Sequence, residues 1–415
     1  MRAGAPDGND LFIRDAAVML GAGLELLQAT NISILDGKIS EIGAARRTGG
    51  QRVLTGKGLL VIPGLVNAHI HLNDAPLKDA GHGKNLDELV HPVTGLKATG
   101  LRSLSTAERV RRMSGALDEM VRGGITGAVD FHEEDISIIE RLRRVNRNSE
   151  ILTVLGRPQR YFSDSDISLN TGFEEDEIVT FDRQQRKFDG VCLSGANEYS
   201  DRAMEQIGAM RKGLSGIHAA ESAGTVERSL RMTGETEVER ISARLRPDFL
   251  VHMTKATESD IDVAAKSVCG VVCCPRSNAI FGVGTPPIGL LAASGLEIAL
   301  GTDNVMVNSP DMFREMDFAA RIARSSALDV LSVQARETIR MATVNGEGII
   351  ARGEGRGIVE GAKADIAIIG MHGVRLSGTH DVYSALVHRA GPGDVMGTVK
   401  SGRLLFRGRG LRMEK

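Results

Sequence analysis

Eight short apolar runs, separated by helix-like segments, constrain the fold of this chain more than any other feature. Continuous apolar runs suit strands that are buried on both faces, as in a parallel sheet. The eight predicted strands are 66–71, 125–131, 151–155, 190–194, 216–219, 249–252, 270–274 and 297–301. Eight parallel strands with crossover helices over roughly 250 to 290 residues have the size and order of a (β/α)₈ barrel, or TIM barrel. The sequence therefore predicts the α/β class.

Helical patterns fill the intervals between the runs. The clearest one begins after Ser105, which together with Glu108 has the spacing of a capping box, and it ends at Gly123-Gly124 before the second strand. Its apolar residues fall on one stripe, as expected for a helix that packs on a sheet. Further helices are predicted over about 135–145, 199–212, 236–245, 257–267, 287–294 and 311–323.

The two ends of the chain lack the alternation of strands and helices and instead show a pattern typical of β-hairpins. Residues 11–62 hold short apolar pieces around turns such as Asp36-Gly37, and the tail has similar pieces around Ser401-Gly402. Neither end could bury an apolar face alone, so we expect both to pair in one small composite β-sandwich. The predicted domains are 1–62 for the first part of the sandwich, 63–354 for the barrel and 355–415 for the second part.

The charge balance and the aromatic content argue against several kinds of partner. With 51 Lys and Arg against 53 Asp and Glu, the net charge of −2 offers no basic field for nucleic acid or anionic lipid. Aromatic residues make up 3% of the chain and Trp is absent, so stacking and membrane-anchoring groups are scarce. No apolar run approaches the roughly 18 residues of a membrane span, and acidic residues interrupt any signal-peptide core in the first 20 positions. We expect a cytoplasmic protein with a small-molecule substrate.

The four cysteines do not indicate a disulfide framework. Cys269, Cys273 and Cys274 crowd one apolar segment without a CxxC spacing, and Cys192 stands apart. This pattern favours buried, reduced thiols over a structural zinc site or a disulfide.

Four of the predicted strands end in side chains that can bind a metal. The first carries His69 and His71, and two His separated by one residue in a strand face the same side. The fifth, sixth and eighth end near His218, His252 and Asp303. Taken singly, each has a structural explanation, such as a hydrogen-bonded core histidine or a helix N-cap. Together they lie at the strand ends where barrel enzymes place their sites. Several imidazoles and a carboxylate are costly to bury without partners, and a divalent metal ion would supply the positive charge and the bonds that they need, so the pattern predicts a metal site.

The segments PGLVNAHIHL, HAAE, VH, CPRSN and GTDN occur in this order along the chain. They resemble the amidohydrolase superfamily, in the mononuclear branch of cytosine, guanine and S-adenosylhomocysteine deaminases and related chlorohydrolases, and the resemblance extends over nearly the whole chain. It implies that His69, His71, His218 and Asp303 bind one Zn²⁺, with Fe²⁺ as the alternative. Binuclear members carry a carboxylated Lys at the end of strand four. Residues 191–197 contain no Lys, which favours a single ion.

The resemblance also implies a reaction, the hydrolytic deamination of a small heterocyclic amine such as a purine, pyrimidine, pterin or nucleoside base. Glu221 would protonate a ring nitrogen, His252 would orient water or stabilise charge, and Asp303 would accept a proton from water. Hydrolysis of a cyclic amide or a carbon–halogen bond on the same scaffold is the alternative, and ammonia release separates the two. A non-catalytic binding module is a minor alternative, which a missing ligand or a missing Glu would indicate.

Substrate contacts are less well defined by the sequence. The long polar loop 73–104 after the first strand is typical of a lid over a barrel mouth, and Asp74, Glu88 and Arg157 are candidate substrate contacts. Glu88 is the candidate for the ribose-contacting Glu of adenosyl deaminases. His132 is open to two interpretations, a pocket wall or a polar residue that leads into a helix. Dimers are frequent among the relatives, so a homodimer is an open expectation.

Overall fold

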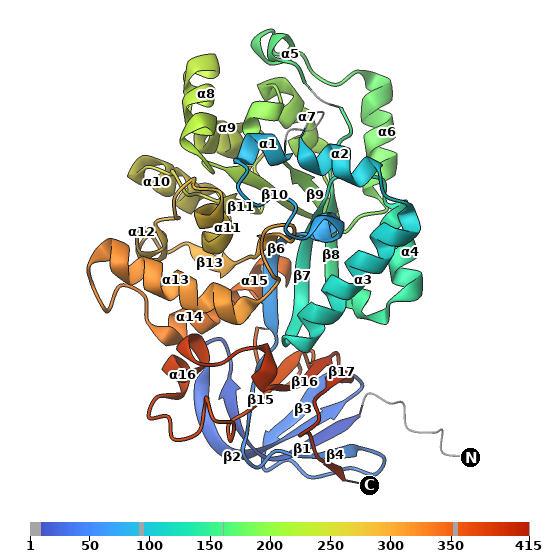
Figure 1. Cartoon of the computed structure of the whole chain (residues 1–415), viewed down its shortest axis with the longest axis vertical. Helices are drawn as coiled ribbons and strands as arrows, with labels where there is room; N and C mark the ends of the chain where they lie inside the picture. The colour runs from blue at the N-terminus through green and yellow to red at the C-terminus, as the bar shows by residue number, and fades with distance from the viewer. Residues whose placement is uncertain (1–9, 91–94, 161, 352–355, 415) are drawn as a thin grey trace.

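The computed structural model describes residues 10–90, 95–160, 162–351 and 356–414, and its strands form two sheets (Figure 1). One sheet runs in the order β13-β12-β11-β10-β9-β8-β7-β6-β14. Its pairs are all parallel. Its strands are β6 (Leu65–His71), β7 (Ile125–His132), β8 (Leu152–Gly156), β9 (Gly190–Leu193), β10 (Leu214–Ala219), β11 (Phe249–His252), β12 (Gly270–Cys273), β13 (Glu297–Leu300) and β14 (Asp303–Asn304). Each of the eight predicted strands and the α/β barrel class are confirmed.

The barrel closes where the eighth strand returns to the first. Asp303 and Asn304 of β14 pair with the end of β6, and only Gly301 and Thr302 separate β14 from β13. Thr302 donates its backbone N–H to Asn67 Oδ1 at 2.9 Å, and Asn67 Nδ2 donates to the Thr302 hydroxyl at 2.7 Å. Gly301 allows this close approach, because a Cβ at that position would lie 2.8 Å from both Cβ and the carbonyl oxygen of His69.

The helices surround the barrel, as predicted. They are α1 (Leu86–Val90), α2 (Leu96–Arg102), α3 (Thr106–Arg122), α4 (Ser137–Val145), α5 (Asp164–Ser168), α6 (Glu175–Gln185), α7 (Asp201–Met210), α8 (Ala223–Thr233), α9 (Glu237–Arg244), α10 (Glu258–Ser267), α11 (Pro275–Ile280), α12 (Ile288–Ala293), α13 (Met312–Ala327), α14 (Ala335–Met341), α15 (Val344–Ala351) and α16 (Val382–His388). Short 3-10 helices are η1 (Leu72–Leu77), η2 (Arg147–Ile151), η3 (Ala196–Glu198) and η4 (Pro392–Asp394).

The expected capping box of α3 is only half formed. The Ser105 hydroxyl accepts the backbone N–H of Glu108 at 3.2 Å. The Glu108 carboxylate turns outward to Arg111 and Arg112 instead of returning to Ser105. The prediction was therefore wrong for the second bond, because two nearby guanidinium groups compete for the carboxylate.

The two chain ends meet in the second sheet, ordered β17-β16-β15-β5-β1-β2-β3 with β4 beside β1 and β18 beside β4. Its strands are β1 (Leu11–Leu20), β2 (Glu25–Leu35), β3 (Lys38–Gly43), β4 (Arg52–Thr55), β5 (Leu59–Pro63), β15 (Ile366–Gly370), β16 (Val395–Lys400), β17 (Arg403–Arg407) and β18 (Met413–Glu414). The joint between the ends is the antiparallel pair of β5 and β15. The predicted union of both ends in one β unit is confirmed.

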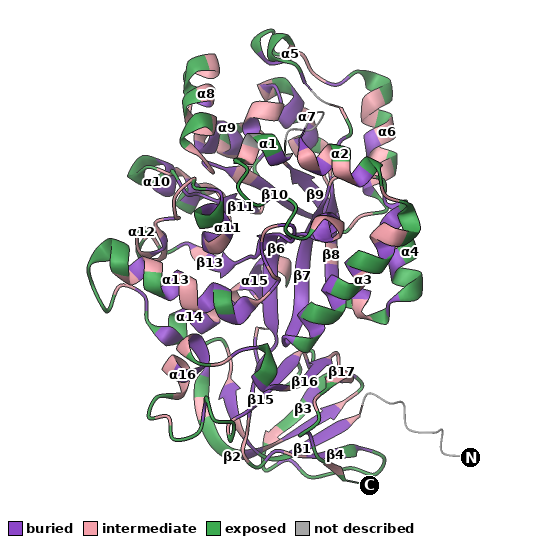
Figure 2. Ribbon diagram, in the orientation of Figure 1, coloured by how far each residue is buried: buried purple, intermediate pink, exposed green. Residues whose placement is uncertain are grey.

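Burial follows this division. Figure 2 shows the barrel strands as almost entirely buried, and the outer faces of the surrounding helices as exposed. A separate apolar cluster joins residues from both ends, including Leu11, Ile34, Ile366 and Val399. The domain limits at 62/63 and 354/355 stay predictions, and the second of them lies outside the described residues. Among the helices that the structure describes, none combines the length and the apolar content needed to cross a bilayer.

The cysteines are unpaired, and the prediction of burial holds for three of them. Cys192, Cys273 and Cys274 are buried, whereas Cys269 is exposed. The prediction was wrong for Cys269 because this residue lies in the connection just before β12, outside the apolar part of the segment.

Candidate active site

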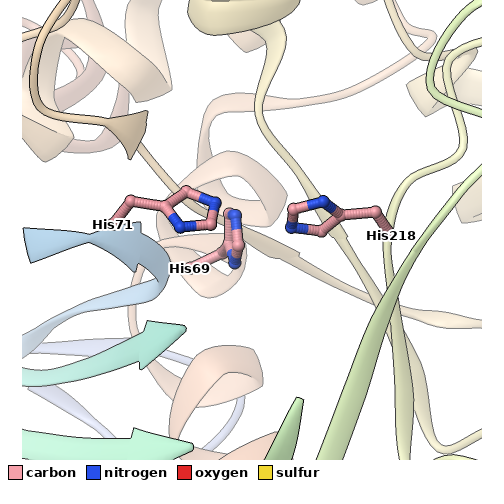
Figure 3. Close-up of side chains that lie close together, drawn as sticks. All are labelled: His69, His71 and His218. Atoms are coloured by element: carbon pink, nitrogen blue, oxygen red, sulfur yellow. The ribbon is translucent and has the colours of Figure 1, made fainter. Parts of the chain in front are cut away.

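Three histidines and one aspartate from three strands meet at the carboxyl end of the barrel. His69 and His71 lie two residues apart on β6, His218 lies on β10, and Asp303 begins β14. The Nε2 atoms of His69 and His71 are 3.2 and 3.4 Å from Asp303 Oδ1. One ligand atom from each histidine lies within 4.8 Å of the others. Figure 3 shows the ring of His69 between those of His71 and His218.

The protonation states of these groups suit a divalent cation. Burial lowers the pKa of His69 and of His218, and it lowers the pKa of His71 to about 3. Burial alone would raise the pKa of Asp303, but the hydrogen bond from His69 and the neighbouring imidazoles bring it well below its usual value. The buried His218 Nε2 has no hydrogen-bond partner. Three neutral imidazoles and a carboxylate, with an orphaned nitrogen among them, fit a zinc-type site.

Neighbouring side chains fix the orientation of these groups. The ring of Phe131 stacks on His218, with planes 2° apart and centroids 5.3 Å apart, and its edge contacts His69. The Ser277 hydroxyl donates to Asp303 Oδ2, which leaves Oδ1 directed at the histidines. The rotamers at the site are therefore set by packing and by a second layer of hydrogen bonds.

Glu221 and His252 form a second group beside the histidines. His252 Nε2 lies 3.7 Å from Glu221 Oε2, and both residues lie within 4.8 Å of a ligand atom of His218. The Asn278 amide is 3.1 Å from His252 Nδ1. If that amide N–H donates to Nδ1, the ring carries its proton on Nε2, on the side of Glu221. Burial raises the pKa of Glu221, against the opposing effect of His252.

Glu237 is a buried carboxylate next to this group that the sequence did not single out. Its Oε2 accepts the backbone N–H of Ala220 at 3.2 Å, where the chain turns with φ of +47° between His218 and Glu221. Burial raises the pKa of Glu237 to about 7. Glu237 begins a helix after the cap residue Thr236, so its sequence context resembles an ordinary helix start. Only the tertiary fold reveals that it supports the turn before Glu221.

Comparisons with known proteins agree with this geometry. Residues 60–405 match the amidohydrolase family. The chain belongs to the amidohydrolase family. A putative aminohydrolase from Methanothermobacter thermautotrophicus is 32% identical over 408 residues, which cover 96% of this chain and 100% of that protein. A 5-methylthioadenosine/S-adenosylhomocysteine deaminase from Haloarcula marismortui is 30% identical, with 84% of this chain and 82% of that one covered.

A zinc-bound adenosine deaminase from Xanthomonas campestris shares the fold of this amidohydrolase. The TM-score is 0.82 at 22% identity, and the match covers 98% of this chain and 95% of the other. The family and the deaminase relatives make this chain a hydrolase of C–N bonds, and they support the hydrolytic deamination of a heterocyclic base. The predicted family, fold and enzyme class are thereby confirmed.

The candidate substrate contacts occupy three different settings in the amidohydrolase. Asp74 is fully buried and forms an ion pair with Lys97 at 3.1 Å. Glu88 is exposed at the start of α1, where its carboxylate accepts the backbone N–H of Asn85 and its own backbone N–H donates to Asn85 Oδ1. Arg157 is partly buried and donates to the Ser194 hydroxyl. All three thus already have partners within the protein, and their roles as substrate contacts stay predictions.

His132 has an interior position. Its side chain is fully buried, with Nε2 3.2 Å from the backbone oxygen of Asp135 and Nδ1 3.6 Å from Asp130 Oδ2. The structure thus favours the second of the two interpretations, a polar residue that leads toward α4.

Described parts of the loop after β6 pack against the loops that follow strands seven and eight, and a role as a lid stays a prediction. Leu89 of α1 packs with Phe281 and Met306, which follow α11 and β14, and Leu96 of α2 packs against the same cluster. We call α1 and α2 together the lid. Because Phe281 and Met306 belong to the loops after strands seven and eight, the lid contacts the rim that also carries Asp303.

Proposed function

We propose that this amidohydrolase removes an exocyclic amino group from a small purine, pyrimidine, pterin or nucleoside base, with one zinc ion held by His69, His71, His218 and Asp303. The observation that supports the proposal most strongly is the approach of two imidazole Nε2 atoms to a single carboxylate oxygen, with the orphaned nitrogen of His218 beside them. Ferrous iron is the alternative ion, since histidine and carboxylate ligands suit both metals.

The protein's own residues divide the proton transfers between them. When bound, the metal supplies Lewis acidity that makes water a nucleophile near neutral pH. Asp303 Oδ1 would accept a proton from the attacking water, while Ser277 holds Oδ2 by a hydrogen bond. His252 presents its Nε2–H on the side of Glu221 and orients the nucleophile. The new C–O bond forms at the amidine-like carbon of the substrate.

Glu221 is proposed as the acid of the reaction. Its raised pKa favours the protonated carboxyl, which can protonate the ring nitrogen next to the reacting carbon. The proton that Asp303 has received then goes to the exocyclic amine, the C–N bond breaks and ammonia leaves. The hydroxyl that was added to the carbon becomes the carbonyl by giving its proton to the Glu221 carboxylate, which restores the protonated acid. Water and amine are thus converted to a carbonyl and ammonia without any redox partner.

We also propose a cytoplasmic location, since the unpaired cysteines suit a reducing compartment. A homodimer remains an expectation, to be measured by light scattering. Substrate is the only partner proposed.

The test is a screen for ammonia release. Purified protein would be loaded with Zn²⁺ or Fe²⁺, its metal content measured, and its activity followed with a library of heterocyclic amines. We expect about one metal per chain and ammonia from a subset of amines. Ring opening or halide release without ammonia would favour the alternative reactions. Wild-type protein that binds no metal, or that binds it and transforms no compound, would contradict the proposal.

A further inference from the structure

A buried lysine links the lid to the metal-site side of the barrel. Lys97 lies in α2, and its Nζ is 2.6 Å from Glu133 Oε2 and 3.1 Å from Asp74 Oδ1. Glu133 follows β7, whereas Asp74 lies in η1 directly after β6. The side chains of Lys97 and Asp74 are 8% and 0% exposed. The side chain of Glu133 is 21% exposed. Three ionisable groups from three separate elements therefore meet in a cluster whose lysine and aspartate are buried.

Glu133 also faces the rear of a proposed metal ligand. Its second oxygen, Oε1, lies 3.5 Å from His71 Nδ1. On the other side of the same ring, His71 Nε2 lies 3.4 Å from Asp303 Oδ1. At 3.5 Å the two atoms are in ion-pair contact, and His71 Nδ1 has no hydrogen-bond partner. A carboxylate that accepts a hydrogen bond from a ligating imidazole fixes the tautomer and the ring orientation and makes the ligand nitrogen more basic, and Glu133 is the carboxylate placed to do so when His71 binds metal. Glu133 thus stands between the lysine of the lid and the ligand ring.

The opposite side of the lid is attached by apolar contacts. Leu89 and Leu96 pack with Phe281 and Met306, whereas Lys97 is the charged attachment near β6 and β7. The position of α2 and the orientation of His71 consequently share one carboxylate. Glu133 contacts both Lys97 and His71, so a displacement of α2 would alter the position of the carboxylate beside the His71 ring, and the reverse also holds.

We propose that Lys97 and Glu133 are positioning residues through which metal binding at His71 and the docking of α2 stabilise each other. This inference rests on the metal site in the proposed function. Thermodynamic linkage makes the coupling reciprocal: if metal holds α2 in place, docked α2 strengthens metal binding by the same factor. Glu133 and Lys97 need not touch the substrate for this role.

The first test measures zinc affinity by competition with a chelator, without reference to activity. Glu133→Gln keeps the size of the side chain but removes the charge, and we expect zinc binding to weaken about 10- to 100-fold. Glu134→Gln is the matched control, because the neighbouring carboxylate pairs with Arg109 instead. Equal zinc affinity in wild type and in Glu133→Gln would overturn the inference.

The second test uses amide hydrogen exchange, and its first part needs only the wild-type protein. Zinc is expected to slow exchange across 96–102 in α2 and to leave α10 unchanged. In Glu133→Gln and in Lys97→Met this zinc-dependent protection should be lost. If the amide exchange rates in α2 of the wild type are the same with and without zinc, the coupling is overturned, even if the variants do not fold. Wild-type protein that binds no zinc would instead refute the proposed function itself.

Discussion

Gly301→Ala is the most direct test of how the barrel positions Asp303. A Cβ at residue 301 would lie 2.8 Å from His69 Cβ, 2.8 Å from its carbonyl oxygen and 2.9 Å from its nitrogen. These atoms belong to strand β6 and cannot rotate away. The backbone at Gly301 does not have a positive φ, so an alanine there would meet no conformational strain of its own. The effect of the substitution is therefore steric.

The size of the effect follows from those distances. Relief of a 2.8 Å contact to ordinary separation requires β13 and β14 to move from β6 by about 0.6 Å. Overpacking of this kind costs about 1–3 kcal/mol of unfolding free energy. Metal–ligand distances tolerate only about 0.2 Å. Since Asp303 lies two residues after Gly301, we expect zinc affinity to fall at least about tenfold.

The assay combines urea unfolding with chelator competition for zinc. Gly115→Ala in α3 is the control, because nothing lies within 4 Å of a Cβ at that position. It should raise the unfolding free energy by about 0.5–1 kcal/mol and leave zinc binding unchanged. A Gly301→Ala protein with wild-type stability and zinc affinity would refute the claim that close strand approach positions Asp303.

Three further predictions concern the site. Glu221→Gln should keep full metal content but turn over about 10² to 10⁴ times more slowly; near-normal ammonia release would exclude Glu221 as the proton shuttle. Burial raises the pKa of Glu237 from 4.5 to about 7, so the native state binds that proton more tightly than the unfolded chain does. Glu237 should therefore contribute a loss of stability of up to about 3 kcal/mol as pH rises from 4.5 to 7. Asp74 and Glu315, whose pKa values burial also raises to about 7, add to the wild-type loss over the same range. Compared by urea unfolding at pH 5 and pH 8, Glu237→Gln should lose less stability than the wild type by the contribution of Glu237, and a pH dependence identical to that of the wild type would contradict it. If metal binds only the native state, zinc at 100 times its Kd should add about 2.7 kcal/mol to the free energy of unfolding. His218→Ala should lose that gain. A chelator that does not change the unfolding midpoint of the zinc-loaded wild type would count against the site.

The barrel could be predicted because its signal is local. Strands buried on both faces need continuous apolar runs, and those of β7 or β11 stand out from the polar helices around them. A barrel was predicted, but the contacts that close it were not, since they depend on a two-residue strand, β14, and on the absence of a side chain at Gly301. Strand β4 was missed for a similar reason: it gains its order by pairing with β1.

The site was predictable to the extent that its residues sit at fixed offsets within strands. His69 and His71 share a face because they are two residues apart, and Glu221 follows the strand that carries His218. No fixed offset within a strand identifies Lys97, Glu133 or Glu237 as site residues. They are ordinary charges in polar segments, and they become parts of one site only when separate loops converge.

Backbone strain is concentrated at the strand ends that carry the chemistry. Ala220, His252, Met253 and Asp303 have φ values of +47°, +78°, +54° and +58°. Non-glycine residues in this region cost about 1 kcal/mol or more each. Glycine would remove the strain, but at positions 252 and 303 it would also remove the imidazole and the carboxylate. The strained turn is held from outside, because Met253 N–H donates to the Ala219 oxygen of the neighbouring strand. The barrel thus stabilises a backbone that these residues would not adopt alone, and the functional side chains project from it.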